Sequence, residues 1–343
     1  MTKTKIACLV CVALIGIGMR IGHYHTRHPD KDELFQLKSL QTYGIRSVFK
    51  NDSFYGDHTS FPGEYLLAYF PMRSLGLLRK NAKIDLQKMM VEGITKKDFY
   101  ILNIPHIIIS VIGMLCFFWL CFYLKHWQSI LLAMGLYFFN VNLIYHEIAF
   151  RPYAVLPDLF MIVIVLCTIF AEEKTKRNWI LFTLLSLFTL IYHAYGIILV
   201  LLPILYFRKL RTDNRVWIIF LIGLAGWANY ASYNTFGMIP NDVQSQMDPF
   251  SYMPKNKFGY LVILNIFGGS TSMMVGIPIV IGGLLLGQNI KGLASFVIIP
   301  IILIIIINII TKYGIHPRQF LFTMPIFAIF CGQCLDKILG KLK

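Results

Sequence analysis

The chain has 343 residues, of which 57% are hydrophobic and only 14% are charged. Soluble domains average roughly 45–50% apolar and about 25% charged residues, so this composition excludes an ordinary soluble protein, a disordered chain and a collagen-like chain. The formal net charge of +15 would suit a nucleic-acid partner, but the basic residues cluster in short connections between apolar runs. We therefore predict an all-α, polytopic, integral membrane protein that binds no nucleic acid.

Ten apolar runs are candidates for membrane-spanning helices, because a helix needs about 20 mostly apolar residues to cross a hydrocarbon core of roughly 30 Å. Two of the runs are short and adjacent, yet a single helix over both would be about 45 Å long. We therefore expect two helices there, joined by a tight turn at His193-Ala-Tyr-Gly196. The runs lie near residues 6–22, 100–123, 128–146, 152–171, 178–193, 194–207, 216–235, 272–288, 293–311 and 319–335.

The basic residues also predict the orientation, since short cytoplasmic loops are enriched in Lys and Arg. The first run has no small-residue cleavage site after it, so we expect an uncleaved span and not a secretory signal. If the N-terminus is cytoplasmic, 14 Lys and Arg residues lie in the inner segments and 5 lie in the short outer connections. Both termini are therefore predicted to be cytoplasmic.

We expect a single transmembrane domain, 1–343, with two long extracytoplasmic segments. Residues 23–99 form the first segment, whose charges do not count toward the orientation because long loops translocate regardless of charge. Its apolar stretch Phe61–Leu78 is expected to be an amphipathic or re-entrant helix on the outer face, because a span there would invert every later basic loop. Residues 236–258 form the second outer loop.

Ionisable residues at the outer ends of the predicted spans are the candidates for a functional site, because charged groups near lipid are costly and usually face a cavity. They come from separate connections, which favours one outward-facing cavity. Asp158 differs from the rest because it lies inside a predicted span. The outer group is Asp30, Asp32, Glu33, His146, Glu147, Arg151, His193, Lys312, His316 and Arg318.

The acidic members of this group also have structural interpretations. The acids of residues 28–33 suit the start of a solvated helix, or else provide a carboxylate that accepts a proton from an acceptor hydroxyl. Glu147, Arg151 and Asp158 would share one face if a continuous helix carried them. These side chains would then either form a structural ion pair or line a cavity wall that binds phosphate.

The basic members are equally open. His193 lies among tyrosines, as in an interfacial aromatic belt, or else faces the cavity. Arg318 either extends to lipid head groups or grips a phosphate with its planar guanidinium. His58 and His146 could join acids around a divalent metal, but no HxxxH or HExxH spacing supports this. Cys331 and Cys334 form a CxxC in a predicted helix without a second pair, which argues against metal or redox use.

Five short motifs follow one another along the chain. They are Asp32-Glu33, His58-Thr-Ser-Phe-Pro-Gly-Glu-Tyr-Leu-Leu67, Arg151-Pro-Tyr-Ala-Val-Leu156, His193-Ala-Tyr-Gly196 and Arg318-Gln-Phe-Leu-Phe-Thr-Met-Pro325. In combination they resemble the GT-C membrane glycosyltransferases, and among these the bacterial relatives of dolichyl-phosphate-mannose protein mannosyltransferases and the aminoarabinose transferases of lipid A. The chain departs from that pattern in having only Pro62 where relatives often have two prolines, and in the wider spacing from Glu147 to Arg151.

The resemblance implies an inverting transferase that moves a sugar from an undecaprenyl- or dolichyl-phosphate donor to a lipid, glycan or protein acceptor on the extracytoplasmic face. It implies that Asp32 is the general base and that Glu33 and Glu147 belong to the catalytic group. The motifs favour the bacterial inner membrane. The resemblance names no certain cofactor and leaves a divalent metal ion open. The residues expected to bind donor phosphate or substrate are His58, Arg151, Tyr153, His193 and Arg318.

Other classes of membrane protein are alternatives. A transporter or flippase of a lipid-linked or anionic substrate would line its path with the same charged residues, but such proteins usually have polar or broken helices at mid-membrane and internal repeats. An O-antigen polymerase or ligase would depend on a large outer loop late in the chain, whereas the large loop here comes first. A non-catalytic membrane scaffold is the remaining alternative.

Overall fold

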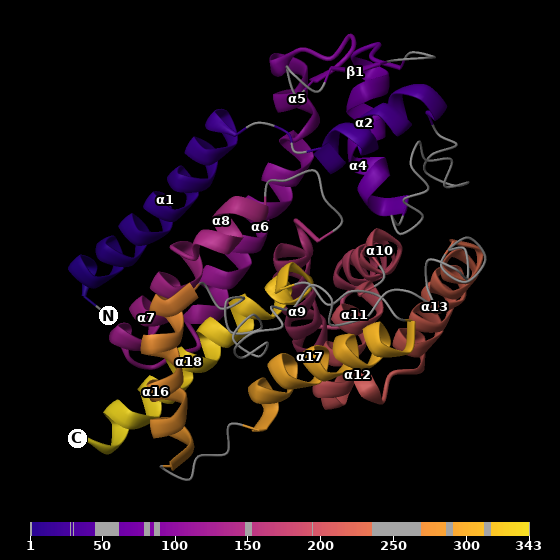
Figure 1. Ribbon diagram of the computed structural model, residues 1–343. Helices are drawn as coiled ribbons and strands as arrows, with labels where there is room; N and C mark the ends of the chain where they lie inside the picture. Colours follow the sequence, from indigo (N-terminus) through magenta and orange to yellow (C-terminus); the bar gives the residue numbers. More distant parts are fainter. Residues whose placement is uncertain are drawn as a thin grey trace. The chain divides into compact units, whose positions relative to one another are not determined.

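The computed structural model describes residues 2–27, 29, 31–44, 62–78, 83–85, 90–147, 153–193, 195–234, 269–285, 291–311 and 317–342. Within these ranges the chain is helical except for one pair of two-residue antiparallel strands (Figure 1). In chain order the elements are α1 (Lys3–Thr26), α2 (Lys31–Tyr43), α4 (Pro62–Ser74), β1 (Ile84–Asp85), β2 (Met90–Val91), α5 (Lys96–Leu102), α6 (Ile104–Cys121), α7 (Trp127–Phe138), α8 (Val141–His146), α9 (Leu156–Glu172), α10 (Lys176–Tyr192), α11 (Gly196–Tyr206), α12 (Arg208–Arg211), α13 (Asn214–Asn234), α16 (Gly269–Leu285), α17 (Lys291–Thr311), the 3-10 helix η1 (Pro317–Thr323) and α18 (Met324–Lys341).

Among the described residues, three helical segments are long and apolar enough to cross a membrane. They are α1, α6 and Phe320–Lys341, which runs from η1 into α18. Shorter apolar helices occupy Trp127–Phe138, Gly196–Tyr206, Asn214–Ala228 and Ser295–Ile306. These helices indicate a membrane protein, in agreement with the composition. The count of about ten spans stays a prediction.

Two of the predicted helix boundaries can be compared directly with the structure. The pair of short runs does form two helices, since α10 ends at Tyr192 and α11 begins at Gly196. The run 128–146, expected to be one helix, is instead divided into α7 and α8. The side chain of Asn140 accepts a hydrogen bond from the backbone N–H of Leu143 at 3.0 Å, and such capping of a helix start competes with helix continuation.

The residues fall into two compact units, each considered by itself. Unit 1 comprises Met1–Gly22, Val111–His146 and Asn241–Lys343, and unit 2 comprises His23–Ser110 and Glu147–Pro240. In unit 1, α18 packs against α7, α16 and α17. The carboxylate of Asp336, near the end of α18, accepts hydrogen bonds from the backbone N–H groups of Lys125 and His126 at 2.6 and 2.8 Å. It thereby supplies acceptors just before α7 begins.

Arg20 is a buried cation within the apolar helix α1. Its side chain donates hydrogen bonds to the carbonyl oxygens of Phe138 at 2.8 Å and Tyr137 at 3.4 Å. Those carbonyls belong to the last turn of α7, where the helix itself leaves carbonyl groups without partners; the Tyr137 oxygen also accepts from the backbone N–H of Asn140 at 3.3 Å. The guanidinium also lies 5.4 Å from the centre of the Tyr137 ring. Arg20 therefore closes the end of α7 and joins it to α1.

Replacing Arg20 with methionine should destabilise unit 1. The variant keeps a long side chain but removes the donor from the buried carbonyls of α7. We expect a loss of about 1–3 kcal/mol in the free energy of unfolding, measured by reversible unfolding of the full chain in mixed micelles. Met19→Leu, on the exposed side of α1, is the control and should change stability by less than about 0.5 kcal/mol. Equal stability of Arg20→Met and the control would contradict the role of Arg20.

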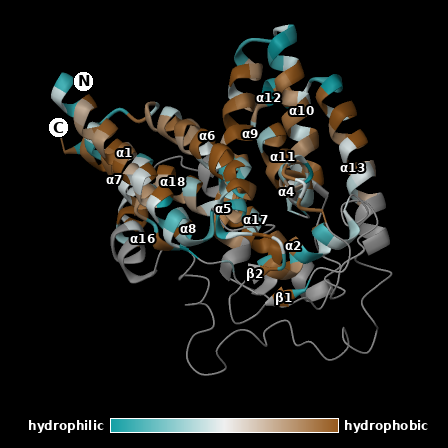
Figure 2. Cartoon of the chain, turned by 90° about the horizontal axis from the view of Figure 1, so that it is seen from above, coloured by the Kyte–Doolittle hydropathy of each residue, from teal (hydrophilic) through white to brown (hydrophobic). Residues whose placement is uncertain are grey.

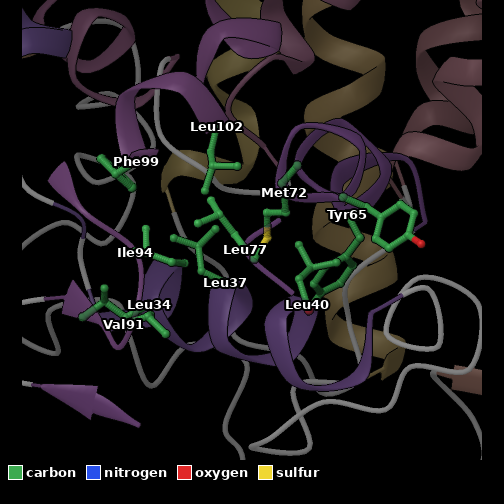
Figure 3. Packing of buried hydrophobic residues seen from close by; sticks show 12 residues of the cluster. Leu34, Leu37, Leu40, Tyr65, Met72, Leu77, Val91, Ile94, Phe99 and Leu102 are labelled. Carbon is green, nitrogen blue, oxygen red and sulfur yellow. The ribbon is translucent and has the colours of Figure 1, made fainter. Parts of the chain in front are cut away.

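In unit 2, α2, α4, α5 and the strand pair share a hydrophobic cluster of their own (Figure 3). Leu34, Leu37 and Leu40 contribute from one face of α2, and Tyr65 and Met72 contribute from α4. The prediction of a helix in Phe61–Leu78 is confirmed by α4. Its 13 residues extend for only about 20 Å, which is too short to cross the hydrocarbon core.

The rest of the described part of unit 2 includes the antiparallel helices α9, α10, α11 and α13 with the short helix α12. Their shared core includes Phe170, Phe182 and Leu190. At the end where α9 stops and α10 starts, Asp213 is buried and pairs with Lys174 at 2.8 Å and with Arg215 at 2.9 Å. The hydrogen bond from Arg215 holds the pKa of the Asp213 carboxyl well below its usual value, against the opposing effect of burial, and Lys174 lowers it further.

The Asp213 network predicts a loss of stability in acid. Because the pKa of Asp213 is lower in the folded chain than in the unfolded chain, its charged form stabilises the fold above about pH 5, and this contribution is lost as the pH falls toward the depressed value. The difference in thermal midpoint between the wild type and Asp213→Asn should therefore shrink between about pH 6 and pH 3. Glu172→Gln, an exposed acid nearby, is the control. A difference that stays constant over this range would contradict the prediction.

Candidate functional site

The end of α1 is fixed to α5 by two tyrosines. The hydroxyl of Tyr24 donates to the backbone oxygen of Tyr100, and the hydroxyl of Tyr100 donates to the backbone oxygen of His25 at 2.6 Å. The two rings lie 5.2 Å apart. This exchange of hydrogen bonds fixes the point where the chain leaves the first candidate span and enters the segment that carries the predicted acids.

Directly after this point, Arg27 and Glu33 form a buried ion pair. The guanidinium Nη2 of Arg27 lies 2.5 Å from Oε2 of Glu33, whose side chain has no exposed surface. The guanidinium also lies 5.7 Å from the centre of the Phe99 ring in α5. A carboxylate without contact to water needs a positive charge and hydrogen bonds to remain ionised. Arg27 provides both and joins the start of α2 to α5.

His106 is a second ionisable residue near this pair. It lies in α6, two residues after that helix begins, and is fully buried. Its ring is close enough to Arg27 for the charge of the guanidinium to act on it. The charge of Arg27 therefore acts on both a carboxylate in α2 and an imidazole in α6. Asp32, the predicted base, precedes Glu33 in the first turn of α2.

The starts of α4 and α11 meet the end of α10. A Cβ atom on Gly63 would lie 2.5 Å from the Cα atom of Tyr192, and one on Gly196 would lie 2.0 Å from the backbone oxygen of Thr189. Only glycine allows these approaches without a shift of the backbone. The two glycines belong to the motifs of residues 58–67 and 193–196. The packing of α4 against α10 therefore brings these two motifs together.

His193 occupies the turn between α10 and α11. Its Nδ1 accepts a hydrogen bond from the backbone N–H of Tyr195 at 3.0 Å, and its ring lies 4.7 Å from the Tyr195 ring. A ring nitrogen that accepts a hydrogen bond carries no proton, so a neutral His193 has its proton on Nε2. The turn thus fixes one tautomer and makes Nε2 a hydrogen-bond donor.

Glu147 and Tyr153 lie between α8 and α9. Glu147, just after α8, is fully buried, whereas Tyr153 is half-buried in the turn before α9. Asp158 is fully buried in the first turn of α9. The positive end of the helix dipole favours an acid at that position.

The condition under which Glu147, Arg151 and Asp158 would share one helix face, a continuous helix that carries all three, is not met. α8 ends at His146 and α9 begins only at Leu156, after a turn at residues 153–155. Pro157 lies in the first turn of α9, where its missing N–H group costs nothing. The proline marks a helix start here, so the spacing of four and seven residues does not place these side chains on one helix face.

The remaining predicted residues are spread over both units and beyond the described ranges. His58 and Arg151 lie outside the described residues. Arg318 lies in η1, which belongs to unit 1, whereas Asp32, Glu33, Glu147, Tyr153 and His193 belong to unit 2. Within the described ranges no three His, Cys, Asp or Glu residues are grouped to hold a metal ion.

The sequence pattern does not predict two polar residues of unit 2 as part of the site. Arg27 is not predicted because its partner Glu33 lies six residues farther along the chain, beyond Pro29, and this spacing matches no helix repeat. His106 is not predicted because it lies within a long apolar run. A histidine in a candidate span is itself a signal, because ionisable groups there usually serve a function.

No protein-family model, curated protein or solved structure matches this chain. The chemistry of the site therefore rests on its own residues. They include a buried carboxylate with its guanidinium, a second buried acid after α8, and an imidazole with a fixed tautomer. Such groups can accept a proton and donate hydrogen bonds to an anionic substrate.

The ion pair of Arg27 and Glu33 predicts strong coupling between the two side chains. Arg27→Met leaves a buried carboxylate without its guanidinium and should cost about 3–5 kcal/mol of unfolding free energy. Replacing both residues, by Arg27→Met and Glu33→Leu, should cost less than the sum of the single changes, because no buried charge is then left behind. The unfolding free energies of the wild type, the two single variants and the double variant, measured on the full chain in mixed micelles, give the coupling energy. Additive losses would contradict the pairing.

Proposed function

We propose that the protein is a membrane glycosyltransferase that uses a sugar linked to polyprenyl phosphate. The observation that carries the proposal is the acid pair at residues 32–33, which starts α2 directly after the first candidate span, with Glu33 buried against Arg27. A lipid-linked donor needs its catalytic acid at the boundary between lipid and water. The resemblance of five ordered motifs to GT-C enzymes supports the same proposal.

The reaction is a single displacement at the anomeric carbon. An acceptor hydroxyl oxygen bonds to that carbon while the bond from the carbon to the phosphate oxygen breaks. The hydroxyl proton passes to the carboxylate of Asp32, the electron pair leaves with the polyprenyl phosphate, and the anomeric configuration inverts. A positioned general base contributes typically 10²–10⁴-fold to such a rate. Glu33, neutralised by Arg27, and Glu147 complete the acidic side of the site.

The phosphate of the donor needs cationic and hydrogen-bonding partners. Arg151 and Arg318 supply guanidinium groups, which match phosphate oxygens in geometry and stabilise the negative charge that develops on the leaving group. His193 offers a donor at Nε2, and His58 and Tyr153 add polar contacts to the substrate. The acceptor is a lipid, a glycan or a protein.

The proposed enzyme has about ten spans in the bacterial inner membrane, with both termini in the cytoplasm. This arrangement directs residues 23–99 to the extracytoplasmic face. The excess of Lys and Arg in the predicted inner segments supports it.

A transporter is the second candidate function. It is favoured by the full burial of Asp158 and His106 within the apolar helices α9 and α6, since ionisable groups inside spans often mark substrate or proton paths. Movement of a lipid-linked or anionic substrate across proteoliposomes, without chemical change, would favour this candidate over the transferase.

Sugar transfer by the full chain in proteoliposomes tests the proposal. The wild type should release free polyprenyl phosphate from radiolabelled polyprenyl-phosphate sugars and label an acceptor. Asp32→Asn should lower transfer by about 10²-fold or more while donor binding is kept. Glu92→Gln, an exposed acid of the same segment, is the control and should retain activity. Unchanged transfer by Asp32→Asn would remove the base, and no transfer from any donor would remove the function.

A further inference from the structure

One end of unit 2 carries a dense cationic surface that the proposed reaction does not use. It is formed by the connection from α9 to α10, by α12 and by the start of α13, which contact one another. Figure 2 shows hydrophilic colour at this end of the helices. Glu172, Glu173 and Asp213 are the acids in these segments. The cations, all exposed, are Lys174, Lys176, Arg177, Arg208, Lys209, Arg211 and Arg215, and we call them the α12 surface.

Asp213 holds the α12 surface together. Its buried carboxylate binds Lys174 from the α9–α10 connection and Arg215 from the first turn of α13. Lys174 also donates a hydrogen bond to the backbone oxygen of Lys209 at 3.4 Å. Connections that are distant in sequence are thus tied to one another, and the cations lie on a fixed framework.

The helix α12 directs its own cations outward. Leu210 is fully buried in the core of the bundle, while Arg208, Lys209 and Arg211 around it are exposed. None of these three, nor Lys176 or Arg177, pairs with a carboxylate among the described residues. Because Lys174 and Arg215 pair with Asp213, five exposed cations remain in these segments, and the only other acids there are Glu172 and Glu173.

The side chains next to the α12 surface are those of a membrane boundary. Trp179 lies 5.3 Å from the guanidinium of Arg215, and the indole N–H of Trp217 donates to the backbone oxygen of Arg211 at 2.8 Å. Tryptophan is enriched at the level of lipid head groups. One or two turns farther along the same helices, large apolar side chains are exposed, among them Leu184, Leu221 and Ile222. Cations, indoles and apolar side chains therefore follow in the order of head group, interface and acyl chain.

We propose that the α12 surface binds the anionic head groups of phospholipids in the adjacent leaflet. Several fixed cations attract a layer of negative phosphodiesters, and each Lys or Arg near such a layer adds to the binding. The exposed apolar residues beside the surface favour a lipid over a soluble polyanion, because a protein or nucleic acid in solution would leave them uncovered. This inference does not depend on the glycosyltransferase proposal.

The test uses the full chain in bilayers of equal parts phosphatidylcholine and phosphatidylglycerol. Spin-labelled forms of each lipid report the association constant of phosphatidylglycerol relative to phosphatidylcholine. The wild type should prefer phosphatidylglycerol. In the triple variant Arg208→Gln, Lys209→Gln and Arg211→Gln this preference should be lost. The relative association constant of phosphatidylglycerol should fall by roughly fivefold for each cation removed at low salt. These side chains are exposed and Leu210 is kept, so folding should be maintained, as thermal unfolding can verify.

The matched control removes three exposed cations from other segments of unit 2, by Arg73→Gln, Lys96→Gln and Lys97→Gln. It lowers the net charge equally and should keep the preference of the wild type. An equal loss in both variants would overturn the proposal, because net charge alone would then explain the binding. Absence of any preference in the wild type would also overturn it and leave a soluble polyanion as the partner. If inorganic phosphate abolishes the preference at constant ionic strength, the surface is a site for free phosphate and the proposal fails.

Discussion

The pairing of Arg27 with Glu33 is the interaction on which the candidate site depends. A carboxylate without exposed surface is stable only beside a compensating charge, and the guanidinium that supplies it comes from the residue that follows α1. The pair therefore fixes the start of α2 to the end of the first candidate span. Two hydrogen bonds act at the same junction, one from the hydroxyl of Tyr24 to the backbone oxygen of Tyr100 and one from the hydroxyl of Tyr100 to the backbone oxygen of His25. Asp32 lies in the turn of α2 that this junction holds.

Buried charges have a second use in this fold, since they complete the ends of helices. Arg20 binds the last carbonyls of α7, and Asp336 accepts the N–H groups that precede it. Asp213 joins the α9–α10 connection to the start of α13 at one end of unit 2. In an apolar chain that offers little water to its helix ends, such side chains replace the solvent as hydrogen-bond partners. The few buried charges described here thus serve particular helix ends and connections.

The apolar runs of the sequence predict the positions of the helices well. Long apolar stretches leave few alternatives to a helix, and Gly196 marks the break after α10 because only glycine fits beside Thr189. Tertiary contacts could not be predicted in the same way. The break after α7 has a local cause in the cap at Asn140, but the last carbonyls of α7 bond to Arg20, more than one hundred residues earlier in the chain, and no local pattern records that contact.

The candidate site could be predicted only in part for the same reason. The acids at residues 32 and 33 follow a span, so their position was visible in the sequence. The partner of Glu33 could not be predicted, because Arg27 lies six residues before it, a spacing that matches no helix repeat. The start of α4 and the end of α10 meet through Gly63, which no spacing rule connects to Tyr192. The motifs that resemble those of GT-C enzymes could be found in the sequence. Only the packing of α4 against α10 shows that the motifs of residues 58–67 and 193–196 lie next to each other.

Hydrogen–deuterium exchange of the full chain in nanodiscs tests the central role of the Arg27–Glu33 pair most directly. If the pair anchors α2 to the end of α1, amides of Lys31–Tyr43 should exchange faster in Arg27→Met than in the wild type. The amides of α10 and α11, which pack in a separate hydrophobic cluster, should exchange at unchanged rates. Unchanged exchange in α2 would show that other contacts hold this helix and would contradict the anchoring role of the pair.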